Sequence, residues 1–379
     1  MTQSNATRPG ALSAQVMSQQ LARFPDYNSS DEAPAKRFDR NARALWGGPL
    51  TPMMASGGAK GRFAKAALSC PPTACTGSME LAPAASSQAW RNPSAIENLV
   101  CVEGEIQVAY GPELAETLTL GLWDMVSIPQ DVRHQVRNSG ETSARLVSIL
   151  SISPEGSFDA VFDQAVAPMV SAQANEQLGV SFDASKGSPV DAATIAGRVT
   201  RFATLVPYKK DLNRTSGLPP EATMRLSAGS VFPLIVPEGH IGRSRTAPMY
   251  GNQGLYISIA ECTAGDDGPP PHAHSDTQES FYVLDGSFEI CTGFDNESMV
   301  PARPNDLFAV PNKVMRTFRN TSGKPARLLV IIQGPDRMQD TVSFSRDIGE
   351  EFKTRFGEDI IAKYADIRMT FDAEERLGA

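Results

Sequence analysis

The chain has 379 residues, of which 41% are hydrophobic, and its formal net charge is −8 at pH 7. This length suffices for two domains with cores of their own. The excess of negative charge argues against a nucleic-acid or anionic-membrane partner. No apolar run approaches the roughly 18 residues of a membrane span, and the N-terminus lacks the apolar core of a signal peptide, so we expect a cytoplasmic protein. The five cysteines, an odd number in a long chain, indicate free thiols and not a disulfide framework.

The N-terminal arm, residues 1–41, is polar apart from one short helix candidate between Ala14 and Phe24. We expect this arm to be loose or to lie on another subunit. Residues 42–155 then carry the signals of short β-strands, in runs rich in aliphatic and β-branched residues that Gly, Pro and Asn turns separate. They predict a first β-domain.

The connector at residues 156–221 is predicted to be helical. Its first apolar residues recur at the spacing of one helical face: Phe158, Val161, Phe162 and Ala165. They predict a helix that packs on the outside of a β-domain, and we expect a second short helix near Ala192.

A second β-domain is expected at residues 222–335. The last segment, residues 336–379, carries two runs of apolar residues at helical spacing, which begin at Ile348 and Ile360. They predict two short amphipathic helices that cover a β-domain or a subunit interface.

The two β-domains are copies of one unit. Residues 92–150 align without gaps to residues 274–332 at a constant offset of 182. Identical residues recur at this offset, and in the first copy they are Glu97, Gly104, Gly111, Asp124, Pro129, Val132, Arg137, Asn138, Ala144, Arg145 and Leu146. Chance would not hold one register over this length, so the chain contains an internal repeat.

The second copy carries a candidate metal site. His272 and His274 alternate on a strand-like register, so their imidazoles point to one face, and Glu279 follows just before an apolar run. Two imidazoles and one carboxylate form a donor set that suits a divalent first-row metal. With no fourth side chain, they leave coordination positions open.

This spacing resembles the first motif of the cupin family, in which His-x-His is followed after four residues by Glu and after six more by Gly, here Gly286. Asp306, Pro311 and Asn320 match the second motif of that family. Arg316 stands where the family carries a histidine as its usual fourth ligand, and a guanidinium that stays protonated cannot replace that ligand. The resemblance covers both copies and implies an all-β chain, with minor helices, made of two tandem cupin (double-stranded β-helix or jelly-roll) barrels.

The two-barrel plan is similar to that of gentisate and related ring-cleaving dioxygenases. For that group the resemblance implies an all-histidine site in the first barrel, whereas here the second copy carries the metal motif. Because cupins commonly pair their barrels, the resemblance also implies a homodimer.

The first copy has kept a different half of the site. His134 and Glu97 hold two of the ligand positions, but Trp90 and Asn92 replace the histidine pair. Two donors rarely hold a metal alone. We therefore expect a degenerate barrel in which His134 and Glu97 form a hydrogen-bonded structural pair.

The favoured hypothesis is a non-haem Fe(II) dioxygenase, because this ligand set leaves positions for a bidentate substrate and dioxygen. Arg316 should project toward the same cavity, where it would bind a substrate carboxylate or a developing oxyanion. His240 is either a further ligand or acid/base group, or a loop histidine with no such role. The expected substrate is a small anion that bears oxygen donors, such as a hydroxylated aromatic acid.

Two other hypotheses stay open. The same ligands holding Mn, Ni or Zn would support isomerase, decarboxylase or lyase chemistry on a keto or hydroxy acid. A cupin that binds a small molecule without turnover is the third hypothesis, and the incomplete ligand set and the degenerate first copy favour it.

Overall fold

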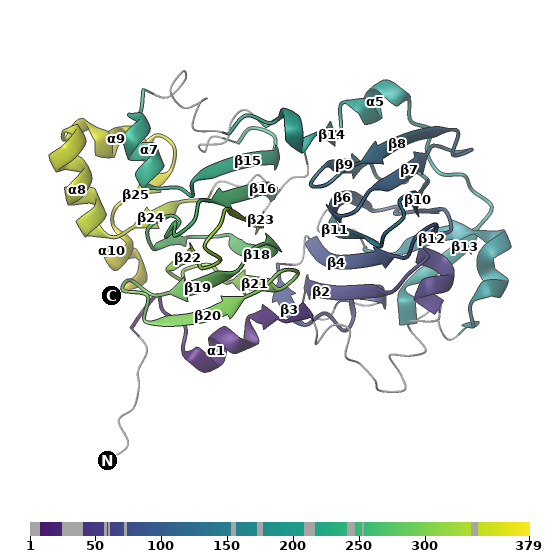
Figure 1. Ribbon diagram of the computed structural model, residues 1–379, viewed down its shortest axis with the longest axis horizontal. Helices are drawn as coiled ribbons and strands as arrows, with labels where there is room; N and C mark the ends of the chain where they lie inside the picture. Colours follow the sequence, from purple (N-terminus) through teal and green to yellow (C-terminus); the bar gives the residue numbers. More distant parts are fainter. Residues whose placement is uncertain are drawn as a thin grey trace, which may run out of the picture. The chain divides into compact units, whose positions relative to one another are not determined.

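The computed structural model describes residues 8–24, 41–56, 59, 61–71, 74–152, 157–172, 177–207, 217–240, 247–251, 254–334 and 340–379. The chain divides into two compact units (Figure 1). We call residues 25–204 the first unit, and residues 1–24 together with 205–379 the second unit. No helix in the described part of the chain is long and apolar enough to span a membrane. All five cysteines are free thiols, as predicted.

The first unit consists of two sheets with its main hydrophobic core between them. One sheet has the order β13 (Val180–Asp183), β12 (Ala160–Asp163), β5 (Trp90–Arg91), β10 (His134–Asn138), β7 (Ile106–Tyr110) and β8 (Glu116–Leu120). The other has the order β14 (Val199–Thr200), β9 (Met125–Ile128), β6 (Ala95–Glu103), β11 (Ala144–Ile152), β4 (Ala74–Leu81), β2 (Leu50–Ser56) and β3 (Leu68–Cys70). Leu99 and Leu146 of the second sheet pack in one cluster with Val108 and Val136 of the first.

The second unit repeats this plan. One sheet has the order β1 (Leu21–Ala22), β21 (Leu307–Val310), β18 (Gln278–Asp285), β23 (Ala326–Gln333), β16 (Leu255–Cys262) and β15 (Ser230–Ile235). The other has the order β20 (Ser298–Ala302), β19 (Phe288–Thr292), β22 (Arg316–Asn320), β17 (His272–His274), β24 (Val342–Phe344) and β25 (Met369–Thr370). Phe281 and Phe318, one from each sheet, pack together in the core, with 5.2 Å between their ring centroids. Two facing sheets that are mostly antiparallel define a jelly roll, so the predicted all-β fold is confirmed.

Strand pairing reproduces the repeat seen in the sequence. Glu97 of β6 lies opposite Ile128, and Glu279 of β18 lies opposite Val310, at the same offset of 182. The pairing extends the repeat beyond the sequence alignment, because Phe162 lies opposite Trp90 as Phe344 lies opposite His272. Equivalent residues therefore occupy equivalent places in the two units.

The prediction of a helix from Phe158 to Ala165 is wrong. Residues 160–163 form β12, which pairs with β5 and β13, and only residues 164–169 form a short 3-10 helix, η2 (Gln164–Met169). Ala160, Val161 and Phe162 are all buried, so the strand is apolar on both faces. A short apolar run of this kind has no periodicity that separates strand from helix.

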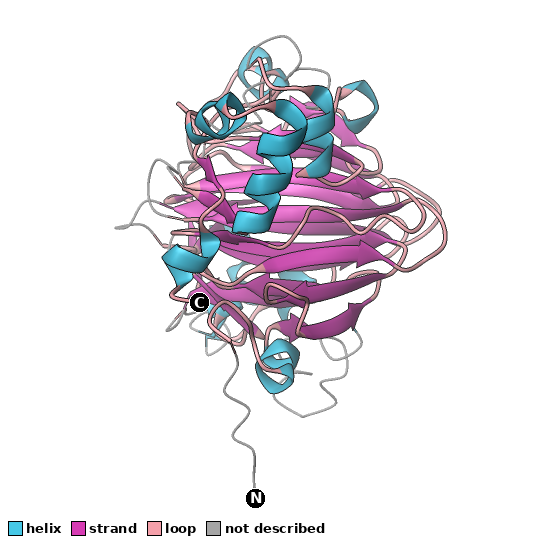
Figure 2. Ribbon diagram, turned by 90° about the vertical axis from the view of Figure 1, so that its left-hand side faces the viewer, coloured by secondary structure: helices cyan, strands magenta, loops and turns pink. Residues whose placement is uncertain are grey.

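The predicted C-terminal helices are present as α8 (Arg346–Phe356) and α9 (Asp359–Ala365), followed by α10 (Ala373–Leu377). With α7 (Pro220–Arg225) they gather beside β24 and β25 of the second unit (Figure 1), and Figure 2 faces this side, with helices in front of the strands. Phe352 and Tyr364 pack there against Phe344. These helices cover one outer side of the sheet that carries β17.

A short helix and strand lie on the edge of each unit. In the second unit, α1 (Ala14–Gln19) and β1 belong to the N-terminal arm, and β1 pairs with β21. In the first unit, α5 (Ala192–Ala196), close to the helix expected near Ala192, precedes β14, which pairs with β9. The described part of the arm, residues 8–24, therefore lies on the second unit of its own chain, where we had expected a loose segment or a contact with another subunit.

The two edge segments hold equivalent aspartates. Arg23 Nη1 donates to Asp306 Oδ2 at 3.0 Å, and the backbone N–H of Phe24 donates to Asp306 Oδ1 at 2.9 Å. In the first unit Arg201 Nη1 donates to Asp124 Oδ2 at 2.6 Å, and the next residue in sequence donates its N–H to Asp124 Oδ1 at 2.9 Å. An Arg-Phe pair thus anchors each edge segment through an aspartate that the repeat shares.

Candidate metal centre

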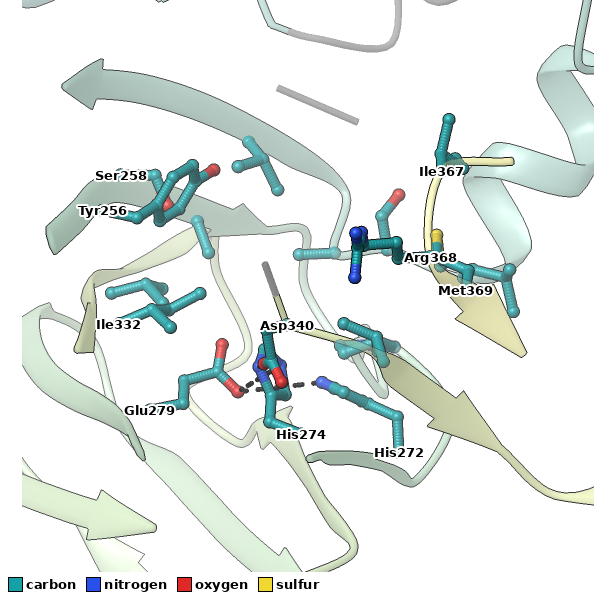
Figure 3. A pocket seen from close by; sticks show the side chains of 18 of the residues that line it. Tyr256, Ser258, His272, His274, Glu279, Ile332, Asp340, Ile367, Arg368 and Met369 are labelled. Carbon is teal, nitrogen blue, oxygen red and sulfur yellow. Dashed lines mark hydrogen bonds and ion pairs between the residues drawn. The ribbon is translucent and has the colours of Figure 1, made fainter. Parts of the chain in front are cut away.

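The three predicted ligands converge in the second unit (Figure 3). His272 and His274 lie on β17, and Glu279 lies on β18 of the opposite sheet. Alternation along β17 turns both imidazoles the same way, and all three side chains are buried. The cluster therefore joins the two sheets at one end of the jelly roll's interior.

The ligand atoms lie within 4.8 Å of one another. His272 Nε2 is 3.7 Å and His274 Nε2 is 3.6 Å from Glu279 Oε2. Bonds of about 2.0 to 2.2 Å from an ion to each atom are compatible with such separations. The residues present thus fit a divalent metal.

The hydrogen-bond partners of the two Nδ1 atoms fix the tautomer and the ring orientation of each histidine. His272 Nδ1 lies 3.0 Å from the carbonyl oxygen of Pro270, and His274 Nδ1 lies 2.6 Å from Asp340 Oδ2 and 2.8 Å from Thr277 Oγ1. A carbonyl or a carboxylate can only accept, so each Nδ1 carries the proton. In the neutral form of each ring, Nε2 is then the nitrogen without a proton. It lies toward Glu279 and is the atom that would bind a metal. Burial lowers the pKa of His272 and so favours its neutral form.

Asp340 is a partner of the candidate ligand His274 that the sequence reasoning missed. It lies beyond the repeat and 66 residues after His274, and no spacing ties the two together. It also accepts from the hydroxyl of Thr277 and from the backbone N–H of Asp276. Burial would raise the pKa of Asp340, but its interaction with His274 and the hydrogen bonds from Thr277 and the Asp276 N–H outweigh it and hold the pKa well below its ordinary value.

Arg316 lies beside the cluster and is completely buried. Its Nε is 3.3 Å from Glu279 Oε2, and its Nη1 donates to the carbonyl oxygen of His272 at 3.2 Å. Burial would raise the pKa of Glu279, but the neighbouring imidazoles and the Arg316 guanidinium hold it at about 2. Arg316 therefore pairs with Glu279 and neutralises its charge. The expectation that its side chain projects into the cavity is wrong, because Arg316 does not line that cavity.

A cavity of about 150 Å³ opens onto the three ligands. Its walls are mainly apolar side chains from β15, β16, β23 and the C-terminal segment, Val231, Val330, Ile332, Val342 and Ile367 among them. Polar groups on the wall include Tyr256, Ser258, Arg368 and the partly buried His240 (Figure 3 labels the first three). The ring of His240 lies 6.0 Å from that of Tyr256. The structure thus brings His240 to the cavity that the ligands share.

The first unit fills the equivalent place with hydrogen bonds. Glu97 Oε2 accepts from Trp90 Nε1 at 3.0 Å and from Asn92 Nδ2 at 2.5 Å, and Oε1 accepts from Ser148 at 2.6 Å. His134 Nε2 lies 3.3 Å from the same carboxylate. These donors occupy the carboxylate that would bind a metal. The expected pairing of His134 with Glu97 is present as a contact of 3.3 Å, while Trp90, Asn92 and Ser148 supply the hydrogen bonds.

Comparison with known proteins agrees with this architecture. The family model described as "Cupin domain" matches residues 77–150 and 259–332, one match in each unit. The chain therefore contains two cupin domains in tandem, one in each unit. A search of curated proteins finds no match.

Several solved structures resemble the chain at low identity. Vicilin from Corylus avellana (hazelnut) is 14% identical, with 79% of this chain and 87% of that chain covered and a TM-score of 0.45. The formate complex of Lactobacillus farciminis oxalate decarboxylase is 14% identical, with 70% and 78% covered and a TM-score of 0.44. AerE from Microcystis aeruginosa is 12% identical, with 70% and 89% covered and a TM-score of 0.42. Similarity at this level carries no argument about activity.

Proposed function

We propose that this bicupin is a metal-dependent enzyme whose second domain holds one divalent ion through His272, His274 and Glu279. The observation that carries the proposal is the arrangement of acceptors. Two imidazole lone pairs face a carboxylate oxygen that accepts no hydrogen bond from the described residues. Arg316 Nε lies 3.3 Å from the same oxygen but makes no printed contact with either Nε2 atom, whereas a metal ion would bind all three acceptors at once.

We propose Fe(II) as the ion and a dioxygenase reaction on a small, anionic, hydroxylated aromatic substrate. Two histidines and one carboxylate with open positions form the ligand set of non-haem Fe(II) oxygenases, in which the metal activates dioxygen and orients the substrate. The cavity supports the substrate class, because a volume of about 150 Å³ with apolar walls is of the size that holds one benzene ring.

The chain's own residues have distinct tasks in this proposal. Asp340 fixes the orientation of His274, and Arg316 keeps Glu279 ionised. The apolar wall, with Val231 and Ile332, excludes water from the reacting atoms. His240 stands on the wall where it can move a proton to or from the substrate.

A redox-neutral reaction on a keto or hydroxy acid is the second candidate. The placement of His240 beside Tyr256 favours it, because decarboxylation, isomerisation and elimination all need a proton donor or acceptor near the substrate. Mn, Ni or Zn would serve at the same three ligands in that case.

Oxygen uptake distinguishes the two candidates. The purified protein is assayed with hydroxylated benzoic acids under air and without oxygen, first with Fe(II) and then with Zn(II). The dioxygenase proposal expects oxygen consumption that requires Fe(II) and disappears in Glu279→Ala. Turnover that persists without oxygen and with Zn(II) selects the redox-neutral reaction. No turnover in either setting favours a cupin that only binds its ligand.

A further inference from the structure

Arg368 occupies an unusual backbone position in the second domain. Its φ is +58°, in the left-handed region that favours glycine, between α9 and β25. Its carbonyl oxygen accepts from the N–H of Val342 at 2.9 Å, where β25 begins to pair with β24. The backbone here is therefore tied into the sheet that carries His272.

The first domain has a glycine at the equivalent place. Gly179 has a φ of +60°, and its carbonyl oxygen accepts from the N–H of Ala160 at 3.1 Å, just before β13 begins to pair with β12. Ala160 and Val342 are related by the offset of 182, so Gly179 and Arg368 are counterparts. A Cβ at Gly179 would lie 2.9 Å from the Cα of Gly61 and 3.1 Å from the carboxylate of Asp159. Glycine therefore suits that site both because φ is positive and because a side chain has no room.

The second domain keeps the left-handed backbone but places a long cationic side chain on it. The Arg368 side chain lines the cavity that His272, His274 and Glu279 share, and Figure 3 shows it among the lining side chains, beside Met369 of β25. The walls around it are mainly apolar. The second domain thus places a guanidinium on the cavity wall where the first domain has no side chain.

We propose that Arg368 anchors the carboxylate of the substrate opposite the metal ligands, so that the substrate is a small carboxylic acid. The inference rests on the proposed function and narrows it. A guanidinium offers two parallel N–H groups that match the two oxygens of a carboxylate. Arg316 is unsuited to this task because it is fully buried behind Glu279 and His272. The cavity of about 150 Å³ limits the acid to one ring or a short chain.

Calorimetric titration with benzoate and with benzamide tests the proposal. The two probes have nearly the same shape, but only benzoate carries the anion. Wild-type full-length protein should bind benzoate more tightly than benzamide, and Arg368→Gly should lower benzoate affinity by about 10- to 100-fold, as expected for a lost charge-assisted hydrogen bond. Because glycine accepts a φ of +58°, Arg368→Gly keeps the backbone conformation, and its melting temperature is measured beside that of wild type to show that the variant is folded.

Lys313→Gly is the control, since it also removes a cation from a left-handed position, with φ of +60°. Lys313 is exposed and does not line the cavity, whereas Arg368 is half-buried on its wall. It should leave benzoate affinity within about twofold of wild type. Arg368→Asn, whose side chain tolerates the same backbone, repeats the test if the glycine variant proves unstable. Equal binding of the two probes, benzoate affinity unchanged in both Arg368 variants, or no benzoate binding by wild type would overturn the proposal.

Metal content of the same preparations separates this inference from the proposed function. If wild type contains no metal and Arg368→Gly no longer binds benzoate, the role of Arg368 is supported and the metal-dependent function is contradicted. If every variant retains the metal and Arg368→Gly binds benzoate as wild type does, the role of Arg368 is contradicted and the metal site is supported.

Discussion

The Nδ1 atom of His274 lies 2.6 Å from Oδ2 of Asp340, although 66 residues separate the two along the chain. This bond fixes the tautomer of one of the three ligands, and a segment outside the sequence repeat supplies it. It implies that the C-terminal segment completes the metal site as well as covering a sheet.

Asp340→Asn is therefore expected to weaken metal binding without unfolding the domain. The amide is a poorer partner for the imidazole N–H, and outer partners of this kind typically contribute about 10- to 100-fold in metal affinity. Competition with a chromophoric chelator measures the change. Asp276→Asn is the control, because Asp276 is exposed and contacts Asp340 through its backbone N–H, which the substitution keeps. Equal affinity in wild type and Asp340→Asn would show that the bond has no part in metal binding.

Arg316→His should strengthen metal binding by about tenfold or more. In the first domain the equivalent residue, His134, places its Nε2 3.3 Å from the Glu97 carboxylate, so the strand geometry delivers an imidazole to the fourth ligand position. The substitution also removes a positive charge next to Glu279. The same chelator assay applies, and a lower affinity than wild type would mean that Arg316 supports the ion and does not merely replace a ligand.

Glu97→Gln should lower the free energy of unfolding by about 3 kcal/mol, because it breaks a buried hydrogen-bonded network. Urea denaturation followed by tryptophan fluorescence measures the loss, since Trp90 donates to this carboxylate. Metal content should not change. A variant as stable as wild type would show that the network contributes nothing net.

The same residue predicts a difference in pH dependence. Burial would raise the pKa of Glu97, but the hydrogen bond of His134 and the charge of Arg62 outweigh it, so the folded pKa lies well below the ordinary value. A carboxyl with a depressed folded pKa contributes stability above its unfolded pKa of about 4.3 and loses it as the pH falls toward the folded value. Wild-type protein should therefore lose more stability than Glu97→Gln between pH 6 and pH 3. Parallel curves for the two proteins would contradict this.

Arg23→Ala should loosen the N-terminal edge segment of the second domain. The arginine pairs with Asp306, whose side chain is buried, and the loss should cost about 1 to 2 kcal/mol locally. Hydrogen exchange of residues 8–24 should accelerate, while Arg201→Ala should do the same to β14 of the first domain and leave residues 8–24 unchanged. Unaltered exchange in Arg23→Ala would show that strand pairing alone holds the segment.

Local sequence patterns predicted the parts of the fold and site that depend on local spacing. The constant offset revealed two equivalent domains, and the His-x-His spacing put His272 and His274 on one face of β17. The helical spacing at Ile360 and Tyr364 identified α9, because one face of that helix is buried and the other is exposed.

Contacts between distant segments could not be predicted in this way. Nothing near Asp340 or Arg368 marks either residue as part of the site, because both reach it from segments beyond the repeat. The β12 strand was misread because burial on both faces removes the alternation that identifies a strand. Arg316 could be placed beside the ligands from the repeat, but its burial behind Glu279 depends on packing that the motif does not encode.

The metal content of protein purified without added metal tests the central claim most directly. Wild type should contain about one iron per chain, His272→Ala and Glu279→Gln should contain almost none, and Glu97→Gln should retain the wild-type amount. Zinc, manganese or nickel in the same pattern would keep the site and contradict the choice of iron. Wild-type protein with no metal, and no uptake of added Fe(II), would contradict the metal centre itself.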